Sequence, residues 1–255
     1  MIESWVMSCS LIFARVGTFV AVLPLFGSRQ VPRLVKVGLA FGLASLWFGA
    51  LGTAPAGEVP QDWATTRWLA YPIAVGRESL IGAVLGYAFG LFLLPARVAG
   101  EFIGQEMGLA LASVADPAAE SSATLVGQLF EILGALIFFG LDGHHAWLAA
   151  LHASFARWPI GSSIFALPVA PLVSGVTQAH EWGLLVAAPL AACLFVTSVL
   201  LALMARAAPQ LNLLSVGFAL RLGVGLVAAV VFMPELVAAL GGVFGRVNEL
   251  LYRLV

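Results

Sequence analysis

Charged side chains are scarce in this sequence. Asp, Glu, Lys and Arg make up 10% of its 255 residues, whereas hydrophobic residues make up 61%. An ordinary soluble domain is about 25% charged. There is too little polar surface here to coat a globule in water, so a bilayer or an apolar complex must solvate most of the chain. The net charge of −1 also gives no electrostatic basis for nucleic-acid binding, and we expect none.

Cysteine is scarce as well, and a secretory signal is missing. Cys9 and Cys193 both lie in apolar runs, and we interpret them as small buried hydrophobic side chains, as is usual for free cysteine. The N-terminus has no basic stretch before its apolar run, and Arg15 interrupts that run. No small-x-small cleavage site fits either. The sequence therefore predicts an uncleaved first helix.

Motifs for catalysis or ligand binding are also missing. The Gly-rich run at 217–225 lies inside an apolar segment and lacks the lysine of a phosphate-binding loop. No nucleophile has a candidate base beside it. His144 and His145 are adjacent, so we expect them to diverge on a helix, whereas a zinc site needs three or four convergent ligands. We therefore predict no enzyme, no cofactor and no metal site.

What the sequence does have is a series of long apolar segments. Several reach the roughly 20 residues with which a helix spans a hydrocarbon core, and no period-two pattern indicates a barrel. We predict an all-α, multi-helix, membrane-inserted protein with a single domain over 1–255. The predicted helices cover 4–26, 34–52, 68–95, 96–113, 124–141, a shorter segment that ends near 156, 180–206, 211–233 and an amphipathic segment at 235–254.

Glycine recurs every fourth residue in two of these predicted helices. Each set lies on one helix face, where another backbone can approach closely, as in small-xxx-small interfaces. A generic contact between apolar helices is the favoured interpretation. The more specific alternative is that the helices over 68–95 and 96–113 pack tightly, either against each other or against a partner subunit. The two sets are Gly82, Gly86, Gly90 and Gly100, Gly104, Gly108.

Several charges lie inside the apolar segments, where they are costly and are candidates for function. A transporter or proton relay requires them to converge on one cavity, whereas structural pairing requires only opposite charges on neighbouring helices or subunits. We favour pairing. Arg97 and Glu101 are four residues apart and could pair on one helix face. The charges are Arg15, Arg77, Glu78, Glu101, Glu106, Glu131, Arg206 and Arg221.

Two blocks of sequence resemble a known family. Residues 97–108 contain Gly100-Glu101, Ile103-Gly104 and Gly108, with Asp116-Pro117 after them, and residues 205–212 read A-R-A-A-P-Q-L-N, with Gly217-Phe218 after them. They resemble the FliR family of flagellar biosynthesis proteins, whose patterns are A-G-E-x-I-G-x-Q-x-G with D-P, and A-R-x-A-P-Q-x-N with G-F. Glu106 stands where the family usually has Gln. Shorter similarities fall at Arg15-Val16, Pro24, Val31-Pro32, 35–39 and 158–161.

The resemblance implies a fold and a role. FliR-type proteins consist of inclined, interrupted helical hairpins, and they assemble with FliP- and FliQ-type subunits, beside an FlhB-type subunit, into the flagellar type III export gate. They lie in the bacterial inner membrane and the flagellar basal body, in contact with lipids, and unfolded flagellar proteins pass through the gate. We expect this chain to form and close that channel. The related SctT subunit of the injectisome is the alternative, and a secondary transporter is less favoured because related halves are not visible.

The resemblance also places a channel-closing loop at about 107–123. Asp116-Pro117 interrupts any helix there, and the small side chains around it offer little packing. An ordinary connecting loop is the alternative. The predicted gate residues are Met107, Gly108, Ser113, Asp116, Pro117, Glu120, Ser121 and Ser122. The predicted packing and assembly residues are Gly82, Gly86, Gly90, Gly100, Gly104, Arg206, Pro209, Gln210 and Asn212.

Overall fold

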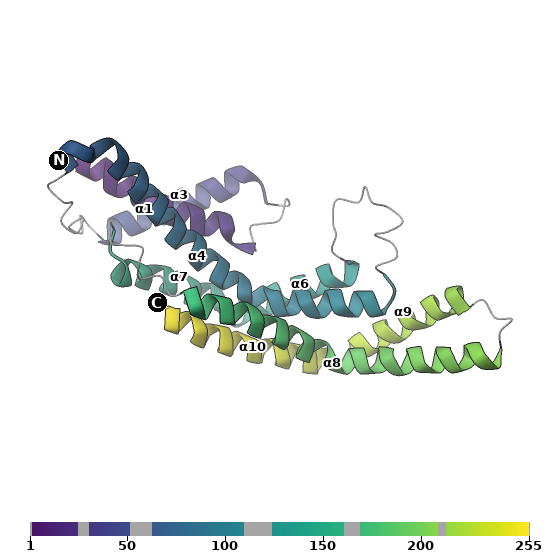
Figure 1. The fold of residues 1–255 in the computed structure, drawn as a ribbon. Coiled ribbons are helices and arrows are strands. Elements are labelled where there is room, and N and C mark those ends of the chain that lie inside the picture. Colours follow the sequence, from purple (N-terminus) through teal and green to yellow (C-terminus); the bar gives the residue numbers. More distant parts are fainter. Residues whose placement is uncertain are drawn as a thin grey trace. The chain divides into compact units, whose positions relative to one another are not determined.

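The computed structural model describes residues 2–24, 31–51, 63–109, 124–160, 169–208 and 213–254. All regular elements in these ranges are helices (Figure 1), which satisfy their backbone groups within one segment, as an apolar environment requires. The all-α prediction is confirmed. The helices are α1 (Ile2–Val22), α3 (Arg33–Leu51), α4 (Trp63–Glu106), α6 (Leu125–Gly140), α7 (Gly143–Arg157), α8 (Val169–Ala207), α9 (Leu213–Val231) and α10 (Met233–Leu254).

Three of these helices contain stretches long and apolar enough to cross a membrane. The stretches are Trp5–Val22 in α1, Tyr71–Glu106 in α4 and Ala170–Ala207 in α8. The count rises to five if each of two bent helix pairs, α6 with α7 and α9 with α10, is taken as one span. The multi-helix membrane character predicted from composition is therefore confirmed.

Helix α4 differs most from the sequence-based prediction. The separate helices expected at 68–95 and 96–113 are one helix, which continues through Pro95 and ends at Glu106. A proline inside a helix costs about 3 kcal/mol relative to alanine. Phe92, Leu93 and Ala96 around it are buried, and each large apolar side chain contributes about 1.5–3 kcal/mol when it is buried. Tertiary packing thus outweighs the local cost of Pro95.

Helix α8 begins earlier than predicted, at Val169 instead of about 180. Pro171 falls in its first turn, where a missing N–H leaves no helical hydrogen bond unmade. Pro189 lies inside the helix without ending it, and Leu190 beside it is fully buried. Proline therefore marks helix boundaries poorly in this chain.

The residues group into two compact units. The first comprises 1–91, 144–174 and 248–255, and the second comprises 92–143 and 175–247. Each unit contains a triad of aromatic rings. Phe19, Phe89 and Trp147 form the first triad, with ring centroids 5.2–6.0 Å apart. Phe92, Phe138 and Phe244 form the second, at 5.1–6.1 Å.

In the first unit, the glycines of α4 let α1 approach closely. A Cβ atom at Gly82 would overlap the backbone carbonyl of Arg15, and one at Gly86 would lie 2.8 Å from the carbonyl oxygen of Phe19. A Cβ atom at Gly90 would likewise lie 3.0 Å from the ring of Pro24. The neighbour of this glycine set is α1, so the expectation that it packs against the segment 96–113 is wrong.

The interpretation of the cysteines as buried side chains is also wrong for Cys9, which is exposed on α1, while Cys193 on α8 is partly exposed. Both helices leave apolar surface uncovered within the chain. Phe195 on α8 is 67% exposed, for example. A small apolar side chain therefore need not be buried inside this chain to avoid water, provided that lipid or a partner covers the surface.

Candidate functional site

The C-terminal end of α4 forms a defined turn in the second unit. Gly108 has a φ of +85°, a left-handed conformation that glycine adopts at little cost. Its N–H donates to the carbonyl of Gln105 at 2.9 Å, and the N–H of Leu109 donates to the carbonyl of Gly104 at 3.0 Å. This pattern satisfies carbonyls that a helix end would otherwise leave unpaired. The chain leaves α4 at a fixed point.

The start of α6 is equally well defined. The hydroxyl of Thr124 accepts the N–H of Gly127 at 3.0 Å, as expected of an N-cap residue. The N–H of Thr124 itself donates to both carboxylate oxygens of Glu101 on α4, at 3.1 and 3.2 Å. A negative charge at the N-terminus of a helix is further stabilised by the helix dipole. Glu101 thus fixes α6 to α4.

Glycines permit this close approach of α4 and α6. A Cβ atom at Gly127 would overlap the carboxylate of Glu101, and one at Gly104 would overlap the side chain of Thr124. A Cβ atom at Gly100 would lie 2.7 Å from the side chain of Phe130. Gly104 therefore contacts both ends of the segment between Leu109 and Thr124. Its carbonyl accepts the N–H of Leu109, and its lack of a side chain leaves room for the side chain of Thr124.

Helix α9 packs against the same end of α4. Met107 is buried, and a Cβ atom at Gly225 would lie 2.8 Å from its side chain, while Phe218 lies beside Gly108. An apolar cavity of about 290 Å³ lies between these helices, α6 and α10, with Ile103 and Met107 among its lining residues. The two predicted gate residues that the structure describes, Met107 and Gly108, are thus fixed by packing and by a helix cap.

The remaining predicted gate residues, Ser113, Asp116, Pro117, Glu120, Ser121 and Ser122, lie outside the described residues, as do Pro209, Gln210 and Asn212 of the predicted assembly set. Arg206 is exposed in the last turn of α8, where its charge complements the helix dipole. Its expected pairing with a partner inside an assembly stays a prediction.

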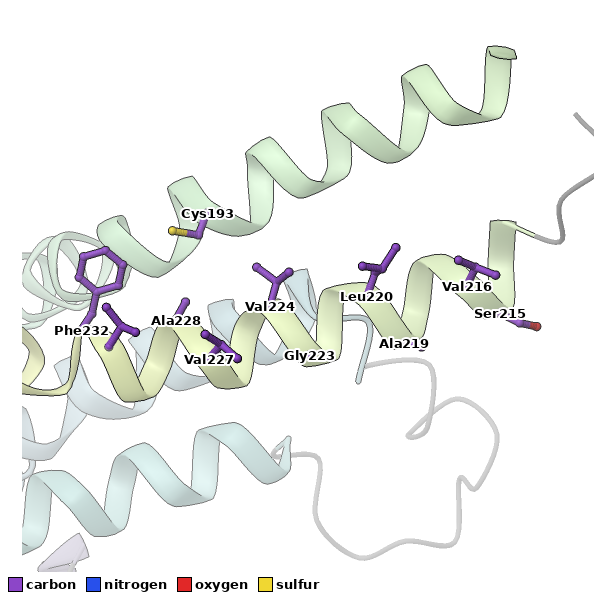
Figure 2. A pocket seen from close by; sticks show the side chains of 11 residues that line it. Cys193, Ser215, Val216, Ala219, Leu220, Gly223, Val224, Val227, Ala228 and Phe232 are labelled. Carbon is purple, nitrogen blue, oxygen red and sulfur yellow. The ribbon is translucent and has the colours of Figure 1, made fainter. Parts of the chain in front are cut away.

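The second unit also carries a large open groove between α8 and α9 (Figure 2). Its volume is about 930 Å³. Cys193 comes from α8, and the other lining residues come from α9 and from Phe232 just after it. The lining is apolar apart from the Cys193 thiol and the Ser215 hydroxyl. Neither this groove nor the smaller cavity is lined by a charged residue, so they do not have the convergent charges that a transporter site requires.

The first unit contains a buried ion pair. The Nε atom of Arg15 on α1 donates to Glu78 on α4 at 2.6 Å, and the two side chains are 0% and 1% exposed. The guanidinium also donates to the carbonyls of Ser154 at 3.0 Å and Trp158 at 2.8 Å, and it lies 4.4 Å from the ring of Phe155. Arg15 therefore joins α1, α4 and the end of α7 through one fully paired side chain.

Other charges are arranged differently from the sequence-based expectation. Within the described residues, Glu101 bonds to Thr124 and Arg97 is exposed, so the expected Arg97–Glu101 pair does not form. The rings of His144 and His145 lie 4.2 Å apart, so the expectation that they diverge is wrong. The Arg15–Glu78 pair is not predictable from the sequence either, because the two charges lie 63 residues apart and no sequence pattern connects them.

Comparison with known proteins assigns the family. Residues 6–247 match the model for bacterial export proteins, family 1. The chain belongs to this family. It is 30% identical to the flagellar biosynthetic protein FliR of Escherichia coli (strain K12), over 99% of this chain and 95% of the relative. It is 28% identical to the FliR protein of Bacillus subtilis (strain 168), over 96% and 93%.

A protein with a different name is also similar to this chain. The Yop proteins translocation protein T of Yersinia pestis is 24% identical over 93% of this chain and 90% of its own length. The resemblance seen in the two sequence blocks thus extends along the whole chain. The family consists of components of protein export systems, which places this chain in an export apparatus with other subunits.

Proposed function

We propose that this chain is the FliR-type subunit of a flagellar type III protein export gate. The observation that carries the proposal is the full-length similarity to flagellar biosynthetic proteins of two bacteria, at 28–30% identity. The similarity to the Yop translocation protein, at 24%, supports the injectisome as the second candidate. The two flagellar proteins above are more similar to this chain than the Yop protein is, which favours the flagellum.

The proposed setting is an assembly in the bacterial inner membrane, at the flagellar basal body, with FliP-, FliQ- and FlhB-like subunits. The uncovered apolar surface supports this setting. Leu203 on α8 and Val230 on α9 are 60% and 73% exposed, and the groove between these helices is open. Contiguous apolar surface of this extent marks an interface with protein or membrane. Unfolded flagellar proteins are the proposed cargo, and the chain has no catalytic role.

Within that assembly, we propose that the segment from Met107 to Ala123 closes the channel. The support comes from its two ends. Gly108 and Thr124 start and finish the segment at fixed points on α4 and α6, and Glu101 holds these points together. A segment anchored in this way can change position without moving the helices that carry it.

The proposal is tested by deleting the gene for this chain in its own bacterium and measuring flagellin in the medium and swimming motility. Loss of both, with recovery when the gene is restored, is expected. Unchanged motility combined with loss of secreted virulence proteins would assign the chain to an injectisome instead. Affinity purification of the tagged chain in mild detergent, followed by mass spectrometry, is expected to recover FliP- and FliQ-like subunits.

A further inference from the structure

The outer face of α8 changes from polar to apolar along the helix. Thr177, Gln178 and Glu181 are exposed near its start. No charged residue follows Glu181 until Arg206, in the last turn. The helix thus has a polar first part, 175–181, and an apolar second part, 184–204. The exposed large side chains of the second part are Leu184, Leu185, Phe195, Val196, Val199, Leu200, Leu203 and Met204.

The apolar part has the length of the hydrocarbon core of a bilayer. By composition alone, the candidate span in α8 is Ala170–Ala207, with 38 residues, which is about 57 Å of helix at 1.5 Å per residue. A hydrocarbon core is about 30 Å thick. Residues 184–204 extend over about 30 Å at the same rise per residue. The apolar part therefore matches the core, whereas the whole stretch exceeds it.

Side chains typical of a membrane surface lie at both ends of the apolar part. At the Glu181 end, the guanidinium of Arg246 on α10 lies 5.7 Å from the centre of the Trp182 ring. Tryptophan is enriched where hydrocarbon meets water, and arginine can keep its charge in the headgroup region. At the other end, Arg206 is exposed, and long basic side chains near the end of a membrane helix extend to the interface. Both limits therefore fit a headgroup region.

The two hydroxyl groups within the apolar part bond to the helix itself. Thr197 Oγ1 donates to the carbonyl of Cys193 at 2.8 Å, and Ser198 Oγ donates to the carbonyl of Leu194 at 2.9 Å. Hydrocarbon offers no hydrogen-bond partner, so polar groups within it must be satisfied by the protein. The exposed side chains are also large, whereas tight helix interfaces are enriched in small residues. Both properties favour lipid over a partner helix as the cover.

Helices α9 and α10 differ in the same way as the two parts of α8. On α9, Val227 and Val230 are 64% and 73% exposed. The charged residue of α9, Arg221, is partly buried. Beyond the bend of 66° between α9 and α10, the exposed residues over 238–246 are alanines, glycines and Arg246. The bend therefore separates an apolar outer face from one without large apolar side chains.

From these observations we infer that phospholipid acyl chains cover the outer face of α9 and of residues 184–204 of α8, and that residues 175–181 of α8 and 238–246 of α10 lie outside the hydrocarbon core. The groove between α8 and α9 then faces the acyl chains, and its lining between Val216 and Phe232 is apolar, as this contact requires (Figure 2). The inference rests on the proposed function only in that the chain works within a membrane assembly. It assigns a membrane depth to each part of the second unit.

Spin-label accessibility in the full assembly tests the inference. Thr177→Cys, Val196→Cys and Ala239→Cys each carry one nitroxide label, in a background with Cys9→Ser and Cys193→Ser, and the assembly is reconstituted in nanodiscs of phosphatidylcholine and phosphatidylglycerol. Oxygen concentrates in hydrocarbon, whereas a polar nickel chelate is excluded from it. We expect the ratio of oxygen to nickel collision rates at position 196 to exceed the ratios at 177 and 239 about tenfold or more.

The labelled positions are matched. Thr177 and Val196 are both exposed on the same helix, so a difference between them reports their surroundings and not their burial in this chain. If Val196→Cys does not assemble, Val199→Cys takes its place, because Val199 is 44% exposed within the same apolar part.

Three results would overturn the inference. They are equal ratios at positions 196 and 177, low collision rates of both reagents at position 196, which would indicate cover by a partner subunit, and a ratio at position 239 as high as that at 196. None of them alters the expected loss of motility and of secreted flagellin on deletion of the gene. Unchanged motility, in turn, would overturn the proposed function and leave the depth profile intact.

Discussion

The carboxylate of Glu101 and the backbone nitrogen of Thr124 are 3.1 and 3.2 Å apart, measured to the two carboxylate oxygens. Glu101 belongs to α4 and Thr124 caps α6, so this contact joins the two helices on either side of the proposed closing segment. The contact is charge-assisted, and hydrogen bonds of this kind are stronger than neutral ones.

Glu101→Leu should destabilise the start of α6. The N–H of Thr124 would lose its acceptor, and hydrogen bonds to charged groups contribute about 1.5–3 kcal/mol. Glu101→Gln keeps an acceptor oxygen and should lose less. Amide hydrogen exchange of residues 124–128 in the purified assembly measures the effect. Glu131→Leu, further along α6, is the control, and equal protection in Glu101→Leu and Glu131→Leu would show that the contact contributes nothing.

Removing one member of the Arg15–Glu78 pair should be severe, whereas removing both should be tolerated better. A single loss leaves a buried charge without its partner and typically costs about 3–5 kcal/mol. The double variant Arg15→Leu with Glu78→Leu removes both charges and should recover much of that loss. Thermal unfolding in detergent, followed by size-exclusion chromatography, gives the order. A double variant that is less stable than both single variants would contradict the prediction.

Leucine substitutions at glycines of α4 should be much more destabilising than a leucine substitution at a glycine of α3. Gly86→Leu places atoms against the Phe19 carbonyl, which is already 2.8 Å from the position of a Cβ atom, and Gly104→Leu overlaps Thr124. Gly42→Leu on α3 meets nothing within 4 Å. Overpacking costs about 1–3 kcal/mol or more, so the first two variants should lower the yield of folded chain and of assembly. Normal yields in both would refute the close-approach interpretation.

Deleting Asp116 to Ser122 tests the proposed closing segment. The capped turn at Gly108 and the Glu101–Thr124 contact lie outside the deletion, so the chain should still fold and assemble. The closed assembly should become permeable to ions, measured as dye or potassium release from liposomes that contain it. An assembled but tight complex would mean that the segment is an ordinary connection, and loss of assembly would mean that it is a structural contact.

The positions of most helices could be predicted because apolar runs of nearly 20 residues have few alternatives in a membrane. The predicted helix at 124–141 corresponds to α6, at 125–140. Proline was a misleading signal for a helix boundary, because the burial of Phe92 and Ala96 maintains α4 through Pro95. Local propensity gives no information on such tertiary packing.

The partners of individual side chains could not be predicted. Glu101 has Arg97 one turn away, yet it bonds to Thr124, which is 23 residues along the chain. Arg15 and Glu78 are 63 residues apart. Sequence identifies which charges are costly in an apolar segment, but which of them meet depends on how the helices pack.

Gly104 lies where both ends of the chain between 109 and 124 come together. Its carbonyl accepts the N–H of Leu109 at 3.0 Å, and the side chain of Thr124 occupies the space that a Cβ atom at Gly104 would need. For a loop whose ends are already held, the entropic cost of doubling its length is only about 0.6 kcal/mol. The entropy of closing this stretch therefore sets little limit on its length. Natural selection can change the number of residues between 109 and 124 at little entropic cost, while Gly104 keeps its contacts with Leu109 and Thr124.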